Sequence, residues 1–266
     1  MSPTTGTDIG AGNSAGKDFT LQNDLDSWVF ASSEGADIDL YCLPPAGAGA
    51  ATYRTWPEVL PRHIGVHRIQ PPGRENRYRE PCCENITDYV AAVCGLIERT
   101  PDRPFALFGH SMGAMIAYEV AIRLRQRTGR QPEHLFVSAF ISPRTPRPEP
   151  IHELPDEEFL RQLRIRYDGI PEELLQYPEV LELMLPIVRA DLALISTYDY
   201  RPNAPLTCPI TVLGGRSDPW INEDQLEDWQ HVTTVPLSRH LLPGGHFYLN
   251  SASSEVLRII DQTLRQ

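Results

Sequence analysis

The stretch ALFGHSMGAMIAYEV, residues 106–120, places a serine between two glycines where an apolar run gives way to a helical pattern. The run covers residues 104–109, and the helical pattern extends from Met112 towards Arg127. A Gly-x-Ser-x-Gly pentapeptide also arises by chance in turn-rich sequences, so its partners elsewhere in the chain must decide its meaning. The specific hypothesis is that Ser111 is a nucleophile held on a sharp turn between a strand and a helix.

The bulk composition is that of an ordinary globular chain with an acidic balance. Of the 266 residues, 41% are hydrophobic and 22% are charged, and the formal net charge is −11. This charge argues against binding to nucleic acid or to an anionic membrane. Residues 54–79 nevertheless carry six arginines against two acidic residues, whereas residues 151–186 carry nine acidic residues against three arginines. The two segments predict either solvated faces of opposite sign or a basic surface that receives an acidic partner.

Apolar runs alternate with amphipathic segments along most of the chain. Strand-like runs cover residues 37–44, 63–70, 104–109, 133–142 and 209–215, and helical patterns cover residues 86–100, 112–127 and 253–266. Strands separated by helices of this length predict an α/β fold, with a mostly parallel sheet covered by helices on both faces. We expect Ser253 or Ser254 to cap the last helix.

The pattern changes between about residues 150 and 200, where helical segments follow one another with no strand between them. Such a block, inserted between two strands, predicts a helical lid over the carboxyl edge of the sheet, where ligands bind in open α/β folds. Residues 1–24 are rich in Ser, Gly, Thr and Asp and predict a disordered N-terminal tail. We therefore expect one domain over residues 25–266, with the lid as an insertion.

The five cysteines show no spacing typical of a metal site or of a disulfide framework. Free thiols fit a reducing cytoplasm. The first 24 residues lack the apolar core of a signal peptide, and no apolar run is long enough to span a membrane. The sequence therefore predicts a cytoplasmic protein with no membrane association, no metal and no cofactor.

A nucleophilic serine needs a neighbouring base, and that base needs an acidic residue to orient it. The histidines that follow Ser111 are His134, His152, His231, His240 and His246. His246 has the most suitable context, because it stands in the loop LLPGGHFYLN immediately before the last helix. The acidic residue is expected just after a strand. Asp218, in RSDPW, lies three residues beyond the run 209–215, although Asp-Pro there also fits a plain turn.

A tetrahedral intermediate at Ser111 needs two N–H donors for its oxyanion. One candidate is the backbone N–H of Met112, which follows the nucleophile and lies at the positive end of the helix. The other is expected from the loop LPPAGAGA, residues 43–50, whose small residues allow close backbone approach. The N–H of Ala46 is the first choice in this loop, and the N–H of Gly47 is the second.

With these features the chain resembles the type II thioesterases, the free-standing editing enzymes of polyketide and nonribosomal peptide assembly lines, over residues 28–264. The blocks that carry the resemblance are LYCLPPAGAGAATYRTW (40–56), QPPGRENRYREP (70–81), LFGHSMGA (107–114), LGGRSDPW (213–220) and LPGGHFYL (242–249). The helical segments between residues 150 and 200 also resemble the lid of that family. The resemblance implies the α/β-hydrolase fold.

The resemblance further implies hydrolysis of acyl groups held on the phosphopantetheine arm of acyl or peptidyl carrier proteins. Ser111 would attack the thioester, His246 would transfer the proton and Asp218 would orient His246. Ala46 and Met112 would hold the oxyanion. No cofactor is implied beyond the phosphopantetheine of the substrate. An acidic carrier protein would suit the basic segment at residues 54–79.

Two other classes of function stay open at this point. The protein could be a medium-chain acyl thioesterase or a small-molecule carboxylesterase, which would cleave a soluble acyl thioester as fast as a carrier-bound one. It could also be a non-catalytic binding module that uses the pocket to capture a ligand. A binding module, however, has no need to retain Ser111, Asp218 and His246 together.

Overall fold

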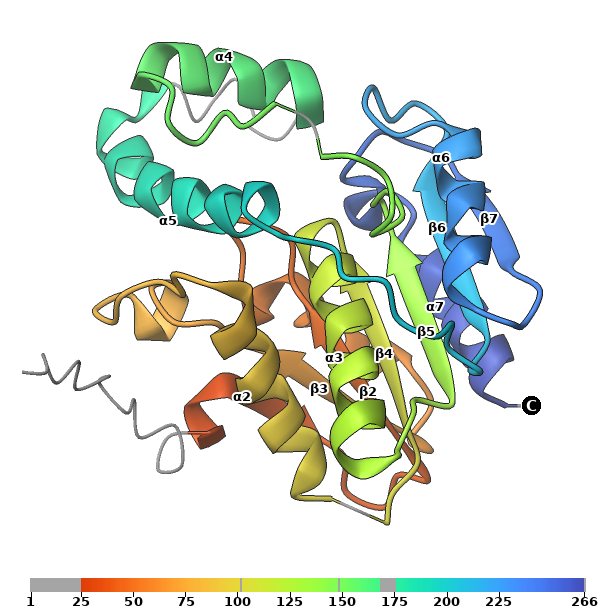
Figure 1. The fold of residues 1–266 in the computed structure, drawn as a ribbon. Coiled ribbons are helices and arrows are strands. Elements are labelled where there is room, and N and C mark those ends of the chain that lie inside the picture. Colours follow the sequence, from red (N-terminus) through yellow and green to blue (C-terminus); the bar gives the residue numbers. More distant parts are fainter. Residues whose placement is uncertain (1–24, 101, 148, 168–175, 266) are drawn as a thin grey trace, which may run out of the picture.

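The computed structural model describes residues 25–265, except residues 101, 148 and 168–175. Its strands form one sheet in the order β1-β3-β2-β4-β5-β6-β7 (Figure 1). The strands are β1 Val29–Ser32, β2 Ile38–Leu43, β3 Ile64–Ile69, β4 Phe105–His110, β5 His134–Ser138, β6 Ile210–Gly215 and β7 Ser238–Leu242. β1 pairs antiparallel with β3, and all other neighbours pair parallel. The mostly parallel sheet expected from the sequence is therefore confirmed.

Helices cover the sheet on both faces. The described α-helices are α1 Trp56–Val59, α2 Ile86–Glu98, α3 Met112–Thr128, α4 Asp156–Tyr167, α5 Pro178–Ser196, α6 Glu223–Glu227 and α7 Ser253–Leu264. α2 and α3 pack side by side on one face, and α7 lies on the other (Figure 1). The expected disordered tail, residues 1–24, lies outside the described residues.

The centre of the sheet is the most deeply buried part of the molecule. Every residue of β4, β5 and β6 is buried, as expected for parallel strands with helices on both faces. α3 lies against β4 and β5, and its first three turns are buried, which explains why residues 112–122 are apolar or small except for Glu119. Gly129, with φ of 77°, ends α3 in the left-handed conformation that glycine adopts easily. β4 and α3 are therefore held rigidly where they meet.

Two strands and one helix start differ from the expectations. β1 and β7 were not expected, because β1 is only four residues long and the sequence of β7, SRHLL, begins with three polar residues. Both lie at edges of the sheet, where such sequences are common. The expected cap of the last helix is wrong: α7 has Ala252 at its N-cap, and no side chain bonds to its first turn.

α4 and α5 form the helical insertion between β5 and β6. They lie over the end of the sheet towards which the central parallel strands run (Figure 1). Buried side chains on both helices, Phe159 and Leu163 from α4 and Val188 and Leu192 from α5, face the body of the protein. The helical pattern expected between about residues 150 and 200 also includes residues 168–175, which lie outside the described residues. The insertion therefore covers the edge at which a site was expected.

Burial of His134 in the sheet gives the protein a pH-dependent stability. The Nε2 atom of His134 lies 2.8 Å from Thr211 Oγ1, and burial lowers the pKa of His134 from 6.5 to about 4. Between these two pH values His134 is protonated in the unfolded chain but stays neutral in the folded protein. We expect the free energy of unfolding to fall by about 3 kcal/mol as the pH drops from about 6.5 to about 4 because of this group.

Urea denaturation at several pH values, with the wild type and a His134→Gln variant, checks this expectation. The variant should be less stable near neutral pH but should lose less of its stability on acidification. Identical slopes for the two proteins would show that His134 does not carry the effect.

Candidate active site

Ser111 lies on a sharp turn between the end of β4 and the start of α3. Its φ and ψ of 53° and −121° are rare for a residue with a side chain. Two glycines make the turn possible. A Cβ atom on Gly109 would lie 2.1 Å from the carbonyl oxygen of Gly113, and a Cβ atom on Gly113 would lie 2.1 Å from the carbonyl oxygen of Leu43. The glycines of the motif are thus required because three backbone segments meet at the serine.

The structure brings the three expected side chains together in a hydrogen-bonded chain. His246 Nε2 lies 3.0 Å from Ser111 Oγ, and His246 Nδ1 lies 2.8 Å from Asp218 Oδ2. With Nδ1–H donating to the carboxylate, Nε2 is left to accept the proton of the Ser111 hydroxyl. The side chains of His246 and Asp218 are each 1% exposed, so the chain is shielded from water. The arrangement suits a serine activated by a histidine.

The loops that carry Asp218 and His246 are bonded to each other through their backbones. Arg216 N–H donates to Leu242 O at 2.8 Å, and Ser217 N–H donates to Gly244 O at 3.0 Å. A Cβ atom on Gly215 would lie 2.2 Å from Gly245 O, so a side chain at 215 would force the loops apart. The ends of β6 and β7 therefore deliver the acid and the base as one unit.

Asp218 serves two purposes at once. Its Oδ1 atom accepts hydrogen bonds from the N–H groups of Trp220, at 2.9 Å, and Ile221, at 3.2 Å, while Oδ2 accepts from His246. Asp218 therefore both forms the turn that the Asp-Pro sequence predicts and orients His246. The turn fixes the carboxylate so that one oxygen faces the imidazole.

The oxyanion loop, residues 45–51, follows β2 and borders the site beside Ser111. Among the described residues, no atom accepts a hydrogen bond from the N–H of Ala46 or of Met112. The N–H of Gly47, by contrast, donates to Asp191 Oδ2 at 2.7 Å. Ala46 and Met112 thus remain able to donate to a bound oxygen atom, whereas the second choice, Gly47, is engaged elsewhere.

A buried polar group that sequence reasoning missed lies behind the imidazole of His246. His110 Nδ1 lies 2.8 Å from Ser138 Oγ, which is also hydrogen-bonded to the hydroxyl of Tyr248. Burial, and next the proximity of His246, hold the pKa of His110 well below 6.5, so its ring is neutral at physiological pH. The two imidazole rings are 5.6 Å apart between centroids. A neutral His110 leaves His246 free to become a cation during a reaction.

An apolar pocket of about 210 Å³ opens beside the nucleophile. Ser111, His246 and the oxyanion loop form its floor. Its other walls are mainly the apolar side chains of the helical insertion, Leu163 and Tyr167 from α4 and Met184, Val188 and Leu192 from α5. A pocket with polar groups at one end and apolar walls beyond them suits a ligand with a reactive carbonyl and a hydrocarbon chain.

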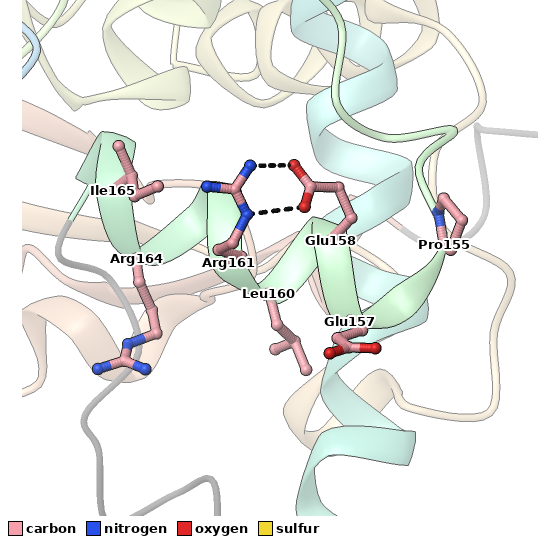
Figure 2. Close-up of a pocket in the computed structure, with 7 residues that line it drawn as sticks. All are labelled: Pro155, Glu157, Glu158, Leu160, Arg161, Arg164 and Ile165. Carbon is pink, nitrogen blue, oxygen red and sulfur yellow. Dashed lines mark hydrogen bonds and ion pairs between the residues drawn. The ribbon is translucent and has the colours of Figure 1, made fainter.

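A larger hollow of about 730 Å³ lies on α4, away from this chemistry. It is lined by residues between Pro155 and Ile165, and the Glu158 carboxylate is paired with both ends of the Arg161 guanidinium at 2.5 and 2.7 Å (Figure 2). Neither the Ser111 hydrogen-bonded chain nor the oxyanion loop contributes to it. We therefore place the reaction in the smaller pocket.

The structure exposes fewer of the arginines at residues 54–79 than the sequence suggests. Arg74 and Arg77 are buried and are paired with Asp191 and Glu80. The exposed arginines of the segment are Arg54, Arg62 and Arg79. The excess of arginines in the sequence therefore overstates the positive charge that a partner would meet.

The described residues also bear on the expectations for metal ions, disulfides and membrane spans. No group of three or more His, Cys, Asp or Glu side chains there is arranged to hold a metal ion. All five cysteines are present as free thiols. No described helix has the length and apolar character needed to cross a membrane.

The reactivity of Ser111 can be tested without a natural substrate. A fluorophosphonate should label the wild type once, at Ser111, and should leave Ser111→Ala unlabelled. Asp218→Asn should react at least about 100-fold more slowly, because the carboxylate orients His246 and stabilises the imidazolium that forms during the attack. Asp224→Asn is the matched control, because it makes the same substitution at an exposed position on α6, and it should react like the wild type. The rate of labelling would be measured by mass spectrometry. An unchanged rate in Asp218→Asn would show that Asp218 does not activate Ser111 through His246.

Comparisons with known proteins identify the family of this chain. The family model of the thioesterase domain matches residues 39–264. The gramicidin S biosynthesis protein GrsT of Aneurinibacillus migulanus is 36% identical and covers 93% of this chain and 97% of its own. Thioesterase PikA5 of Streptomyces venezuelae is also 36% identical, covering 93% and 89%. The solved structure of the type II thioesterase BorB from the borrelidin biosynthetic cluster is 34% identical, with a TM-score of 0.80 over 89% of this chain and 97% of BorB.

These matches confirm the resemblance and the fold class inferred from the sequence. The matched region includes β2 to α7 and therefore the nucleophile turn, the oxyanion loop, the helical insertion and the loops of Asp218 and His246. The chain belongs to the thioesterase family, with the α/β-hydrolase fold.

Proposed function

We propose that this protein is a type II thioesterase that releases acyl groups from the phosphopantetheine arm of acyl or peptidyl carrier proteins. The observation that carries the proposal is the hydrogen-bonded chain Ser111–His246–Asp218 at the floor of an apolar pocket. This arrangement occurs in a chain of the thioesterase family, whose structural relatives include the type II thioesterase BorB from the borrelidin biosynthetic cluster.

In the first half of the reaction, Ser111 Oγ attacks the carbonyl carbon of the thioester. His246 Nε2 accepts the hydroxyl proton, and Asp218 stabilises the imidazolium that forms. The backbone N–H groups of Ala46 and Met112 donate to the oxyanion, and each such donor contributes about 3 kcal/mol to lowering the barrier. When the C–S bond breaks, the imidazolium gives its proton to the departing phosphopantetheine thiolate, and the acyl group stays on Ser111.

In the second half, water takes the place of the departed thiol. His246 Nε2 removes a proton from the water molecule as it attacks the acyl-Ser111 ester, and the same donors hold the new oxyanion. Collapse breaks the ester bond, and His246 returns the proton to Ser111 Oγ. The products are a free carboxylic acid and the unchanged enzyme.

The cofactor, the acyl chain and the cellular location follow from the same reaction. The phosphopantetheine arm belongs to the carrier protein, and the enzyme needs no metal or cofactor for the chemistry above. The acyl chain is placed among the side chains of α4 and α5, which supply the apolar walls of the pocket. The free thiols of the five cysteines fit a reducing compartment, which supports a cytoplasmic location.

Hydrolysis of one acyl group presented in two ways tests the proposal. The same acyl group would be offered on a carrier protein and on a short pantetheine mimic, to the wild type and to Ser111→Ala. We expect a higher kcat/KM for the carrier-bound form and no activity in Ser111→Ala. Equal rates for both forms would favour a medium-chain thioesterase or general esterase. Activity in Ser111→Ala equal to that of the wild type would contradict the mechanism.

The position of the acyl chain predicts a change in chain-length preference. Met184 on α5 lines the pocket, whereas its neighbour Leu183 is 75% exposed on the outer side of the same helix. Met184→Trp should fill part of the pocket and lower kcat/KM for a decanoyl thioester more than for an acetyl thioester. The matched control, Leu183→Trp, adds the same bulk outside the pocket and should leave the ratio of the two kcat/KM values unchanged. An unchanged ratio in Met184→Trp would place the acyl chain elsewhere.

A further inference from the structure

The block QPPGRE, residues 70–75, contributes nothing to the Ser111 hydrogen-bonded chain, yet its polar side chains converge on the oxyanion loop. Gln70 Oε1 accepts a hydrogen bond from Ala50 N–H at 2.9 Å. Glu75 accepts from Ala51 N–H at 3.3 Å, and Arg74 Nη1 donates to Ala48 O at 3.3 Å. The last half of the loop is thus held from the side of β3.

The first half of the loop is held from the helical insertion. Asp191, on α5, accepts the N–H of Gly47 at 2.7 Å through Oδ2. The same carboxylate forms a two-pronged ion pair with Arg74, in which Nη2 lies 2.9 Å from Oδ1 and Nη1 contacts Oδ2. Arg74 is 3% exposed and Asp191 is fully buried, so the pair is closed to solvent. Burial alone would lower the pKa of Arg74, but the bond to Asp191 outweighs it and raises that pKa.

Contact between α5 and Gly47 is close as well as polar. Gly47 has φ of 79°, and a Cβ atom there would lie 2.7 Å from Val188 Cγ2 on α5. α5 also supplies Met184 and Leu192 to the acyl pocket. The helix that walls the pocket therefore directly sets the backbone conformation beside Ala46, the residue whose N–H remains free.

Stability alone is a poor explanation for this ion pair. Burying two charges costs about as much as their attraction returns, and well-packed apolar residues often replace such pairs without loss of stability. What apolar residues cannot do is accept the N–H of Gly47. A fixed carboxylate in this place turns the Gly47 N–H towards α5.

We propose that Arg74 and Asp191 are positioning residues that seat the oxyanion loop against α5, so that the Ala46 N–H is presented to the acyl oxygen. Arg74 fixes the carboxylate from the side of β3, and Asp191 anchors Gly47 from the side of the insertion. The inference rests on the proposed thioesterase reaction, in which Ala46 is an oxyanion donor.

A set of variants separates positioning from stability. Asp191→Leu and Arg74→Met each leave one buried charge unpaired, so both should lower the melting temperature. The double variant Arg74→Met/Asp191→Leu removes both charges and should regain much of the melting temperature. Its kcat on an acyl-pantetheine should nevertheless stay down by about 100-fold, as expected for a misplaced oxyanion donor, with little change in KM.

Asp191→Asn should lower the melting temperature but largely keep kcat, the reverse of what the double variant should show. It therefore tests the proposal even if the double variant does not fold. The amide oxygen can still accept the N–H of Gly47, although Arg74 loses its counter-charge. This variant should therefore have a lowered melting temperature but a kcat much closer to the wild type than that of Asp191→Leu. A kcat that simply follows the melting temperature across the set would overturn the proposal.

The matched control is Arg189→Met, which removes the ion pair between Arg189 on α5 and Asp156, 2.6 Å apart, without touching the oxyanion loop. Its kcat should equal that of the wild type. The affinity for a trifluoromethyl ketone, a transition-state analogue, should fall in proportion to kcat across the Asp191 variants. The affinity for a thioether substrate analogue should be the same in all of them. Ser111→Ala in the same assay reports separately on the proposed function, because its activity does not depend on how Gly47 is anchored.

Discussion

The close approach of three backbone segments at Ser111 is the constraint on which the site depends. β4, the first turn of α3 and the end of β2 meet there with no room for a Cβ atom at residue 109 or 113. The meeting forces Ser111 into a rare backbone conformation that the buried sheet must hold in place. It also brings the oxyanion loop, which follows β2, beside the nucleophile. One steric arrangement thus positions both the attacking atom and the donors for the oxygen.

The hydrogen bonds of the buried polar groups around Ser111 leave the atoms needed for the reaction free to act. Asp218 uses one oxygen for its own turn and the other for His246. Asp191 takes the N–H of Gly47 and leaves that of Ala46. Ser138 Oγ is hydrogen-bonded both to Nδ1 of His110 and to the hydroxyl of Tyr248. The ring of His110 is neutral and therefore does not repel a protonated His246. The electrostatics of the site therefore depend on hydrogen bonds from the ends of β4 and β5, from the loops after β2, β6 and β7, and from the insertion.

The sequence predicted the central strands, the nucleophile turn and its partners, because these features are local or occur in a fixed chain order. Edge strands β1 and β7 were not predicted in this way, because β1 is only four residues long and β7 begins with three polar residues. The role of Arg74 could not be predicted either. It is one of six arginines within residues 54–79, and only the fold places it against Asp191, far along the chain. Asp191 did leave a signal, as a lone acid inside the apolar run LPIVRADLALIS. Reading that signal requires knowing which way α5 faces.

Transfer of the acyl group to Ser111 is the central claim, and rapid quenching of a single turnover tests it most directly. Wild-type enzyme would be mixed with an acyl-loaded carrier protein, quenched in acid at short intervals and analysed by mass spectrometry. We predict that the peptide containing Ser111 gains the mass of the acyl group and loses it as the free acid appears. Release of the acid without any acylated Ser111, at the same rate in Ser111→Ala, would show that water attacks the thioester directly and would contradict the account.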